Sequence, residues 1–136
     1  MQDYRKLLVW QKAHKLAVNT YALSEYFRRP ESWKLRDQIF DAVVSIPANI
    51  AEGYARDHLG ESLHHLAIAA GSLAELQTLL TLSGRLGYIA AEQLVCPLSL
   101  ALETERMLCA LRRTLRARRN RRPSWHTSRH GRERTS

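Results

Sequence analysis

Residues 45–56 read Ser45-Ile46-Pro47-Ala48-Asn49-Ile50-Ala51-Glu52-Gly53-Tyr54-Ala55-Arg56, and the helices expected on either side are organised around this stretch. Apolar side chains recur every three or four residues through it: Ile39, Val43, Ile46 and Ile50. That spacing is typical of the buried stripe of a helix. Pro47 has no N–H to donate to the carbonyl of Val43, and its ring crowds that carbonyl. We therefore expect a kink near residues 43–47, unless Ser45 begins a new helical segment.

A stripe of small residues follows downstream, at Ala67, Ala70, Gly71 and Ala74. If residues 57–60 turn the chain back, two antiparallel helices of equal rise bring this stripe against Ala48, Ala51 and Ala55. Pro47 would then face Gly71. A glycine in mid-helix costs roughly 1 kcal/mol relative to alanine, and this contact would give it a packing reason. The sequence therefore predicts a tight helical hairpin built around a Pro47–Gly71 contact.

Four amphipathic patterns run along the chain, over about residues 8–27, 33–56, 61–85 and from 91 onward. Gly87 is expected to end the third helix. Pro97 either kinks the fourth helix or marks its first turn. Short turns between four helices imply antiparallel neighbours. The predicted fold class is all-α: an antiparallel up-down-up-down four-helix bundle over residues 1–118, followed by a disordered, basic, Arg-rich tail over residues 119–136.

The formal net charge of +8 is distributed unevenly. Residues 1–111 carry 11 Lys and Arg against 12 Asp and Glu, whereas residues 112–136 carry 10 Arg and one Glu. Cations near a helix C-terminus are favourable, so the first of these arginines also suit a helix end. The remaining excess, with Trp125 interleaved, favours binding to the phosphate backbone of RNA or DNA. A solubilising extension without a ligand is the alternative.

The predicted topology gathers further positive charge at the root of this tail. The second and fourth helices end where the first begins, so Arg5, Lys6 and Arg56 lie at the same end. The candidate nucleic-acid-binding residues are Arg5, Lys6, Arg56, Arg112, Arg113, Arg116, Arg118, Arg119, Arg121 and Arg122.

Three ordered motifs carry a family resemblance: residues 45–53, residues 68–76 and Leu86-Gly87-Tyr88-Ile89. With them, the chain resembles the bacterial four-helix bundle family, also called the ribosomal RNA intervening-sequence protein family, from about Trp10 to Leu111. The resemblance implies an up-down-up-down bundle, often assembled as a ring of five. It also implies a distant likeness to the accessory protein of diversity-generating retroelements, which binds nucleic acid and a reverse transcriptase.

A polar stripe shares the helix of the opening stretch, at Ser45, Asn49, Glu52 and Arg56. A solvated face is the simplest interpretation. The stripe is short-chained and free of lysine, however, and depletion of charge is typical of surfaces buried between subunits. Together with the resemblance, this favours a subunit contact of a homo-oligomer, with a pentamer favoured.

Catalytic and metal chemistry find little support in the sequence. Glu61 and His64 have the spacing of one half of a di-metal site, but the remaining ligands are missing. Glu52 and His65 face each other in the hairpin register, as an acid–base pair or, preferably, as an interhelical hydrogen bond. No activated nucleophile and no glycine-rich phosphate loop accompany them. We therefore expect no enzyme, no metal and no cofactor.

The two cysteines and the N-terminus bear on location. Cys96 and Cys109 would lie roughly 20 Å apart on one helix, too far for a disulfide, which suggests a reducing cytosol. The apolar run of residues 7–10 is too short for a leader or a membrane span. The sequence thus favours a cytoplasmic, homo-oligomeric, nucleic-acid-binding accessory protein with no membrane association; the alternative is a protein–protein interaction scaffold.

Overall fold

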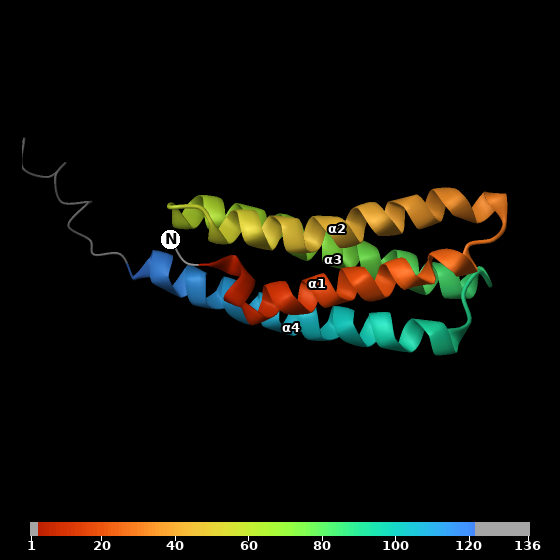
Figure 1. Cartoon of the computed structure of the whole chain (residues 1–136). Coiled ribbons are helices and arrows are strands. Elements are labelled where there is room, and N and C mark those ends of the chain that lie inside the picture. The colour runs from red at the N-terminus through yellow and green to blue at the C-terminus, as the bar shows by residue number, and fades with distance from the viewer. Residues whose placement is uncertain (1–2, 122–136) are drawn as a thin grey trace, which may run out of the picture.

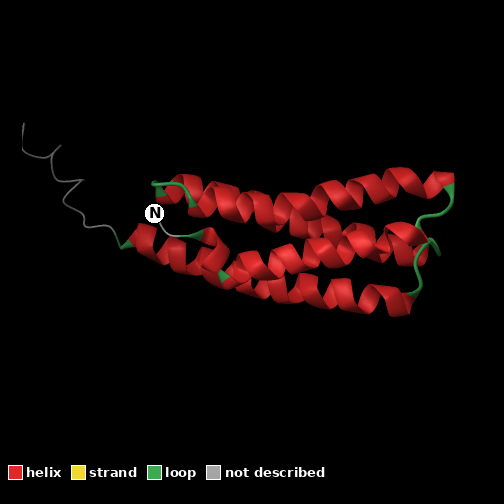
Figure 2. Ribbon diagram, viewed as in Figure 1, coloured by secondary structure: helices red, strands yellow, loops and turns green. Residues whose placement is uncertain are grey.

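The computed structural model describes residues 3–121, and the regular structure in this part of the chain is entirely helical (Figures 1 and 2). The four long helices are α1 (Leu8–Tyr21), α2 (Trp33–Tyr54), α3 (Leu59–Arg85) and α4 (Ala91–Asn120). Short 3-10 segments cover Tyr4–Lys6 before α1, and Ala22–Tyr26 and Pro30–Ser32 between α1 and α2.

The helices form the predicted antiparallel four-helix bundle. The main contacts run between α1 and α2, α2 and α3, α3 and α4, and α4 and α1, so each helix has two neighbours around the core. Figure 1 shows the start of the chain, the α2–α3 turn and the end of α4 together at one end. The all-α fold class is confirmed. Helix α4 continues to Asn120, so it includes residues 119–120 of the segment expected to be tail; the expected disorder of 122–136 lies outside the described residues.

The core consists of one apolar side chain per turn from each helix. Its largest fully buried members are Leu16, Ile39, Ile46, Ile50, Leu66, Leu73, Leu76, Leu80 and Leu108. An ion pair of 2.8 Å between Lys12 and Glu103 joins α1 to α4 at the surface, and the Lys12 ammonium lowers the pKa of that carboxyl. The two side chains are partly exposed, so the pair is a surface contact between the helices. Leu8, at the start of α1, and Met107 of α4 line the same surface pocket.

Both internal prolines are accommodated inside continuous helices. Helix α2 runs through Pro47 without a new start at Ser45, and its axis changes direction near the middle of the helix (Figure 1). Pro97 is buried in the second turn of α4, so it does not mark the first turn of that helix. Gly87 ends α3 as predicted. Its φ is 78°, and the backbone N–H of Tyr88 donates to the carbonyl of Ser83 at 3.0 Å, which is the hydrogen bond of a Schellman motif.

The predicted hairpin of α2 and α3 forms, but the predicted Pro47–Gly71 contact is wrong. A Cβ placed on Gly71 would meet nothing within 4 Å, and Gly71 is exposed. The antiparallel register is as expected, since the Ser72 hydroxyl donates to the Ser45 hydroxyl at 2.9 Å. The helices are rotated so that Gly53 makes the close approach: its Cβ would lie 3.0 Å from the carbonyl oxygen of Ser62. Hydrogen-bonding side chains, rather than the alanine stripe, occupy the contact.

Helix α3 is unusually apolar. Within residues 3–121 it is the one helix long and apolar enough to cross a membrane, with a mean hydropathy of 1.3 over 18 residues. The bundle buries 33% of that window, and core helices of soluble proteins meet the same criterion. This feature is therefore weak evidence for a membrane span.

Replacement by alanine should change the stability of the fold in opposite directions at Gly53, near the end of α2, and at Gly71, in the middle of α3. Gly71→Ala adds a methyl group in open space and should stabilise the fold by about 0.5–1 kcal/mol through helix propensity. Gly53→Ala adds the same methyl group against the backbone of Ser62 and should destabilise it relative to Gly71→Ala by about 1–3 kcal/mol. Chemical denaturation of the two variants measures the difference. Equal stability changes would show that α2 and α3 do not approach closely at Gly53.

Candidate nucleic-acid interface

Positive charge is concentrated at one end of the bundle. The segments that meet there, residues 3–7, 55–62 and 110–121, carry nine Lys and Arg against three Asp and Glu. The segments at the opposite end, residues 25–37 and 85–93, carry five Lys and Arg against four Asp and Glu. The bundle is therefore electrostatically polar along its length. We call the first of these ends, defined by residues 3–7, 55–62 and 110–121, the basic end.

Local partners increase this difference. At the opposite end, Arg29 lies 3.8 Å from Glu31 and 4.9 Å from the ring centroid of Tyr88, and Arg36 lies 3.2 Å from Asp37. At the basic end, Arg5 pairs with Asp3 at 2.9 Å, and this side-chain hydrogen bond holds the pKa of Asp3 below its usual value. Within the described residues, no ion pair is formed by the remaining basic side chains of this end: Lys6, Arg56, Arg112, Arg113, Arg116, Arg118, Arg119 and Arg121.

The basic end is also open, because α4 extends further toward this end of the bundle than α1 does. Residues 108–120 of α4 lie beyond Leu8, the first residue of α1, and at 1.5 Å per helical residue they span about 20 Å. Leu111 and Leu115 are left half-buried beside a cavity of about 120 Å³, which is also lined by Leu59, Leu66 and Arg56. The structure therefore places Arg56, in the turn between α2 and α3, beside the arginine-rich end of α4, as the sequence predicted.

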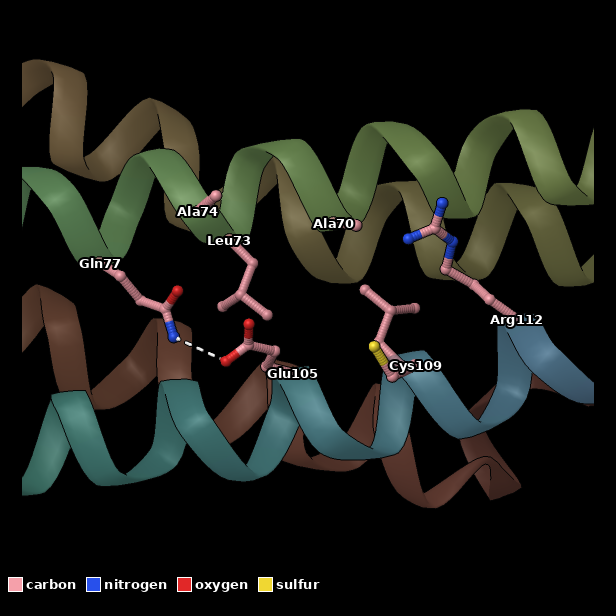
Figure 3. Close-up of a pocket in the computed structure, with 8 residues that line it drawn as sticks. Ala70, Leu73, Ala74, Gln77, Glu105, Cys109 and Arg112 are labelled. Atoms are coloured by element: carbon pink, nitrogen blue, oxygen red, sulfur yellow. Dashed lines mark hydrogen bonds between the residues drawn. The ribbon is translucent and has the colours of Figure 1, made fainter.

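The arginines of α4 differ in exposure. Arg113, Arg116, Arg118, Arg119 and Arg121 are exposed, as are Arg5, Lys6 and Arg56, whereas Arg122 lies outside the described residues. Arg112 is half-buried, and its side chain extends from α4 toward α3 (Figure 3). Its Nε atom is buried and has no hydrogen-bond partner in the structure. Only the exposed arginines can contact a polyanion that binds along the surface.

The polar stripe of α2 is part of a hydrogen-bonded network with α3. The Asn49 amide donates to the carbonyl of Ser45 at 2.9 Å and lies 3.0 Å from its hydroxyl. His65 Nδ1 lies 3.3 Å from the Asn49 Oδ1 atom and 3.2 Å from the Glu52 Oε2 atom. The Ser72 hydroxyl completes the network through Ser45. Nδ1 faces two oxygen acceptors, so it carries the proton in this arrangement.

This network explains why short polar side chains occupy the stripe: they make hydrogen bonds within the same chain. Ser45 and Asn49 are half-buried against α3, while Glu52 and Arg56 remain exposed. The predicted subunit contact through Ser45, Asn49, Glu52 and Arg56 is not tested by a single chain and stays a prediction. The predicted contact between Glu52 and His65 is present on a partly solvated face, with 3.2 Å between His65 Nδ1 and Glu52 Oε2. Sequence reasoning missed Ser72 and the link between Asn49 and His65, which the hairpin register alone could have suggested.

Metal and thiol chemistry receive no geometric support within residues 3–121. No group of three or more His, Cys, Asp or Glu side chains there could hold a metal ion, and Glu61 and His64 remain an isolated pair. Cys96 and Cys109 are both free and exposed. Neither the cavity beside Leu111 and Leu115 nor the hydrogen-bonded network of α2 and α3 contains an activated nucleophile, so the geometry does not point to catalysis.

These features define the class as an antiparallel four-helix bundle with one basic end. Residues 5–110 match the family described as 23S rRNA-intervening sequence protein, and this chain belongs to that family. The chain is also similar to a crystal structure from Bacteroides thetaiotaomicron VPI-5482, described as a protein with unknown function from the S23 ribosomal protein family. That likeness has 25% identity and a TM-score of 0.71, and it covers 76% of this chain and 97% of that one. No curated protein matches the chain.

Proposed function

We propose that this chain is a non-enzymatic, cytoplasmic accessory protein that binds nucleic acid, with RNA favoured, through its basic end. The observation that carries the proposal is the set of exposed arginines without acidic partners gathered there from the α2–α3 turn and from α4. Arginine binds phosphate oxygens through charge-assisted, bidentate hydrogen bonds. The name of the family, which refers to 23S rRNA, favours RNA over DNA.

Phosphate contacts of this kind fix position and affinity without reading sequence. Binding should therefore depend steeply on salt, because each neutralised phosphate releases counterions.

The proposal includes self-association, with a ring of five as the resemblance implies. The contact surface would contain Ser45, Asn49, Glu52 and Arg56, together with Ile68, which is 39% exposed one turn after His65 on α3. Because Ser45 and Asn49 already satisfy their hydrogen bonds within the chain, their burial would cost little. Several basic ends on one face of a ring would raise the effective concentration of weak phosphate sites by roughly 10²–10⁴.

A protein–protein interaction scaffold is the second candidate. The observation that favours it is an exposed apolar patch on α1 and α2, where Val18 is 64% and Val44 is 47% exposed beside the stacked rings of Tyr21 and Phe40. A protein partner, such as the reverse transcriptase implied by the resemblance, would dock there, and the basic end would have no ligand of its own.

Neutralising the basic end should weaken RNA binding. In the full chain, Arg56→Gln, Arg113→Gln and Arg116→Gln together should lower the slope of log Kd against log salt by about two, since each lost phosphate contact removes about 0.7 for single strands. Fluorescence anisotropy with a labelled RNA over a salt series measures the slope.

The matched control removes three charges from the opposite end: Arg28→Gln, Lys34→Gln and Arg85→Gln. These changes should leave the slope within about half a unit of the wild type. Equal losses in both triple variants would contradict a directional site, and the absence of RNA binding by the wild type would favour the scaffold.

The subunit contact has a separate test. Ile68→Arg places a charge in the proposed contact without touching the polar network, so it should shift sedimentation toward the monomer while helicity is retained. Leu102→Arg, at a position of α4 with similar exposure (43%), is the control and should sediment as the wild type does. A monomeric wild type would refute the contact.

A further inference from the structure

Three aromatic rings lie in a row that starts at the basic end. The ring centroids of Tyr4 and Trp10 are 5.3 Å apart in an edge-to-face contact, and those of Trp10 and His14 are 5.1 Å apart. Trp10 and His14 are one helical turn apart on α1, whereas Tyr4 belongs to the 3-10 segment that precedes this helix. We call these three side chains the aromatic row. It begins where Figure 1 shows the start of the chain, and it follows α1 away from the basic end.

Hydrogen bonds fix the segment that carries Tyr4. The backbone N–H of Arg5 donates to the Asp3 carboxylate at 3.0 Å, and the Gln11 amide donates to the carbonyl of Arg5 at 2.9 Å. The backbone N–H of Leu7 donates to the carbonyl of Tyr4, also at 2.9 Å. The segment packs against both α1 and α2. The bundle therefore determines the position of the first ring.

The two outer rings of the aromatic row are accessible to a ligand. Tyr4 is 36% exposed and His14 is exposed, while Trp10 between them is half-buried. Single exposed apolar side chains are normal on protein surfaces and need no function. The aromatic row differs from such cases, because its rings contact one another and its first ring lies among positive charges.

These positive charges come from two segments of the basic end. The Arg5 guanidinium, which is paired with Asp3, lies 5.9 Å from the centroid of the Tyr4 ring. Lys6 follows in the same segment, and Arg56 lies in the turn after α2, at the same end of the bundle. Lys6 and Arg56 are exposed, and neither forms an ion pair within the described part of the chain.

Exposed rings beside unpaired cations suit a single-stranded nucleic acid. Its bases stack on aromatic side chains, while its phosphates bind the cations. In a duplex, each base is already stacked between its neighbours and has no free face to offer. A duplex would therefore contact the cations alone, whereas a single strand can use both parts of this surface.

We propose that the aromatic row is a stacking platform for unpaired bases of single-stranded RNA, with the adjoining phosphates bound by Lys6 and Arg56. This inference rests on the proposed function and names the class of RNA that it takes. Tyr4 stacks on the first base, and the strand continues along α1 toward His14. Every base has a π face, so the platform accepts all four bases without reading sequence.

The test compares the full-length wild type with Tyr4→Leu on labelled oligo(U) and on duplex RNA, each of about 12 nucleotides. Leucine keeps an apolar side chain but has no π face. Tyr4→Leu should therefore weaken binding to oligo(U) about fivefold or more and leave the affinity for the duplex unchanged. The slope of log Kd against log salt should also stay the same, because no charge is removed. Fluorescence anisotropy over a salt series measures both quantities.

Three further variants separate stacking from folding. Tyr4→Phe keeps the ring and should bind oligo(U) as the wild type does. His14→Gln removes the other outer ring from an exposed position of α1, and it should weaken binding to oligo(U) alone. Tyr21→Leu is the matched control: it removes a ring of similar exposure (45%) at the other end of α1, and it should bind as the wild type does.

The possible results distinguish this inference from the proposed function. Equal losses for oligo(U) and duplex in Tyr4→Leu, or no loss for either, would overturn the stacking platform while leaving the phosphate-binding function intact. A loss in Tyr21→Leu as large as that in Tyr4→Leu would overturn it as well. No binding of the wild type to either RNA would overturn both.

Discussion

Gly53 and the interhelical contacts of Ser45 with Ser72 and of Asn49 with His65 hold α2 close against α3. The carbonyl oxygen of Ser62 lies only 3.0 Å from the position of a Cβ on Gly53, so a side chain there would push the helices apart. The network that links Ser72, Ser45, Asn49 and His65 can form in one register alone, because a shift by one turn would separate its donors from their acceptors. Buried polar networks of this kind specify a unique arrangement even where they add little stability.

The position of the basic end depends on this register. The hairpin sets where α2 ends, and therefore places Arg56 beside Leu111 and Leu115 of α4. Helix α1 begins at Leu8, near Met107 of α4, which leaves the last three turns of α4 without α1 on one side. The arginines of those turns consequently lie on the surface with few acidic neighbours. Arg112 differs from them, since it is half-buried and its side chain extends toward α3 (Figure 3). The proposed phosphate affinity thus depends on the extension of α4 beyond α1.

Much of the fold was predictable because its signals are local or periodic. The apolar stripe of α2, the stop at Gly87 and the antiparallel register of the hairpin all follow from spacing, and all are observed. The Pro47–Gly71 contact was not observed, because small residues permit close packing without requiring it. Serine, asparagine and histidine bury a donor or an acceptor only when a partner is present, and their pairing rotated the helices away from the alanine stripe.

The site was less predictable than the fold. Composition alone shows that arginine is concentrated near the C-terminus, but it does not distinguish Arg112 from Arg113, which follows it in the chain. Their different exposure depends on which side of α4 faces α3, a tertiary property. The compensation of Arg29 by Glu31 and Tyr88 likewise requires the folded bundle, although the near balance of charges at that end was visible in the sequence.

Photochemical cross-linking tests most directly the claim that nucleic acid is bound at one end of the bundle. Full-length protein is irradiated with an oligonucleotide that carries 4-thiouridine, and the cross-linked peptides are identified by mass spectrometry. Cross-links are expected within residues 55–62 and 110–121, which belong to the basic end. Cross-links concentrated in residues 25–37 and 85–93, or spread evenly along all four helices, would contradict it.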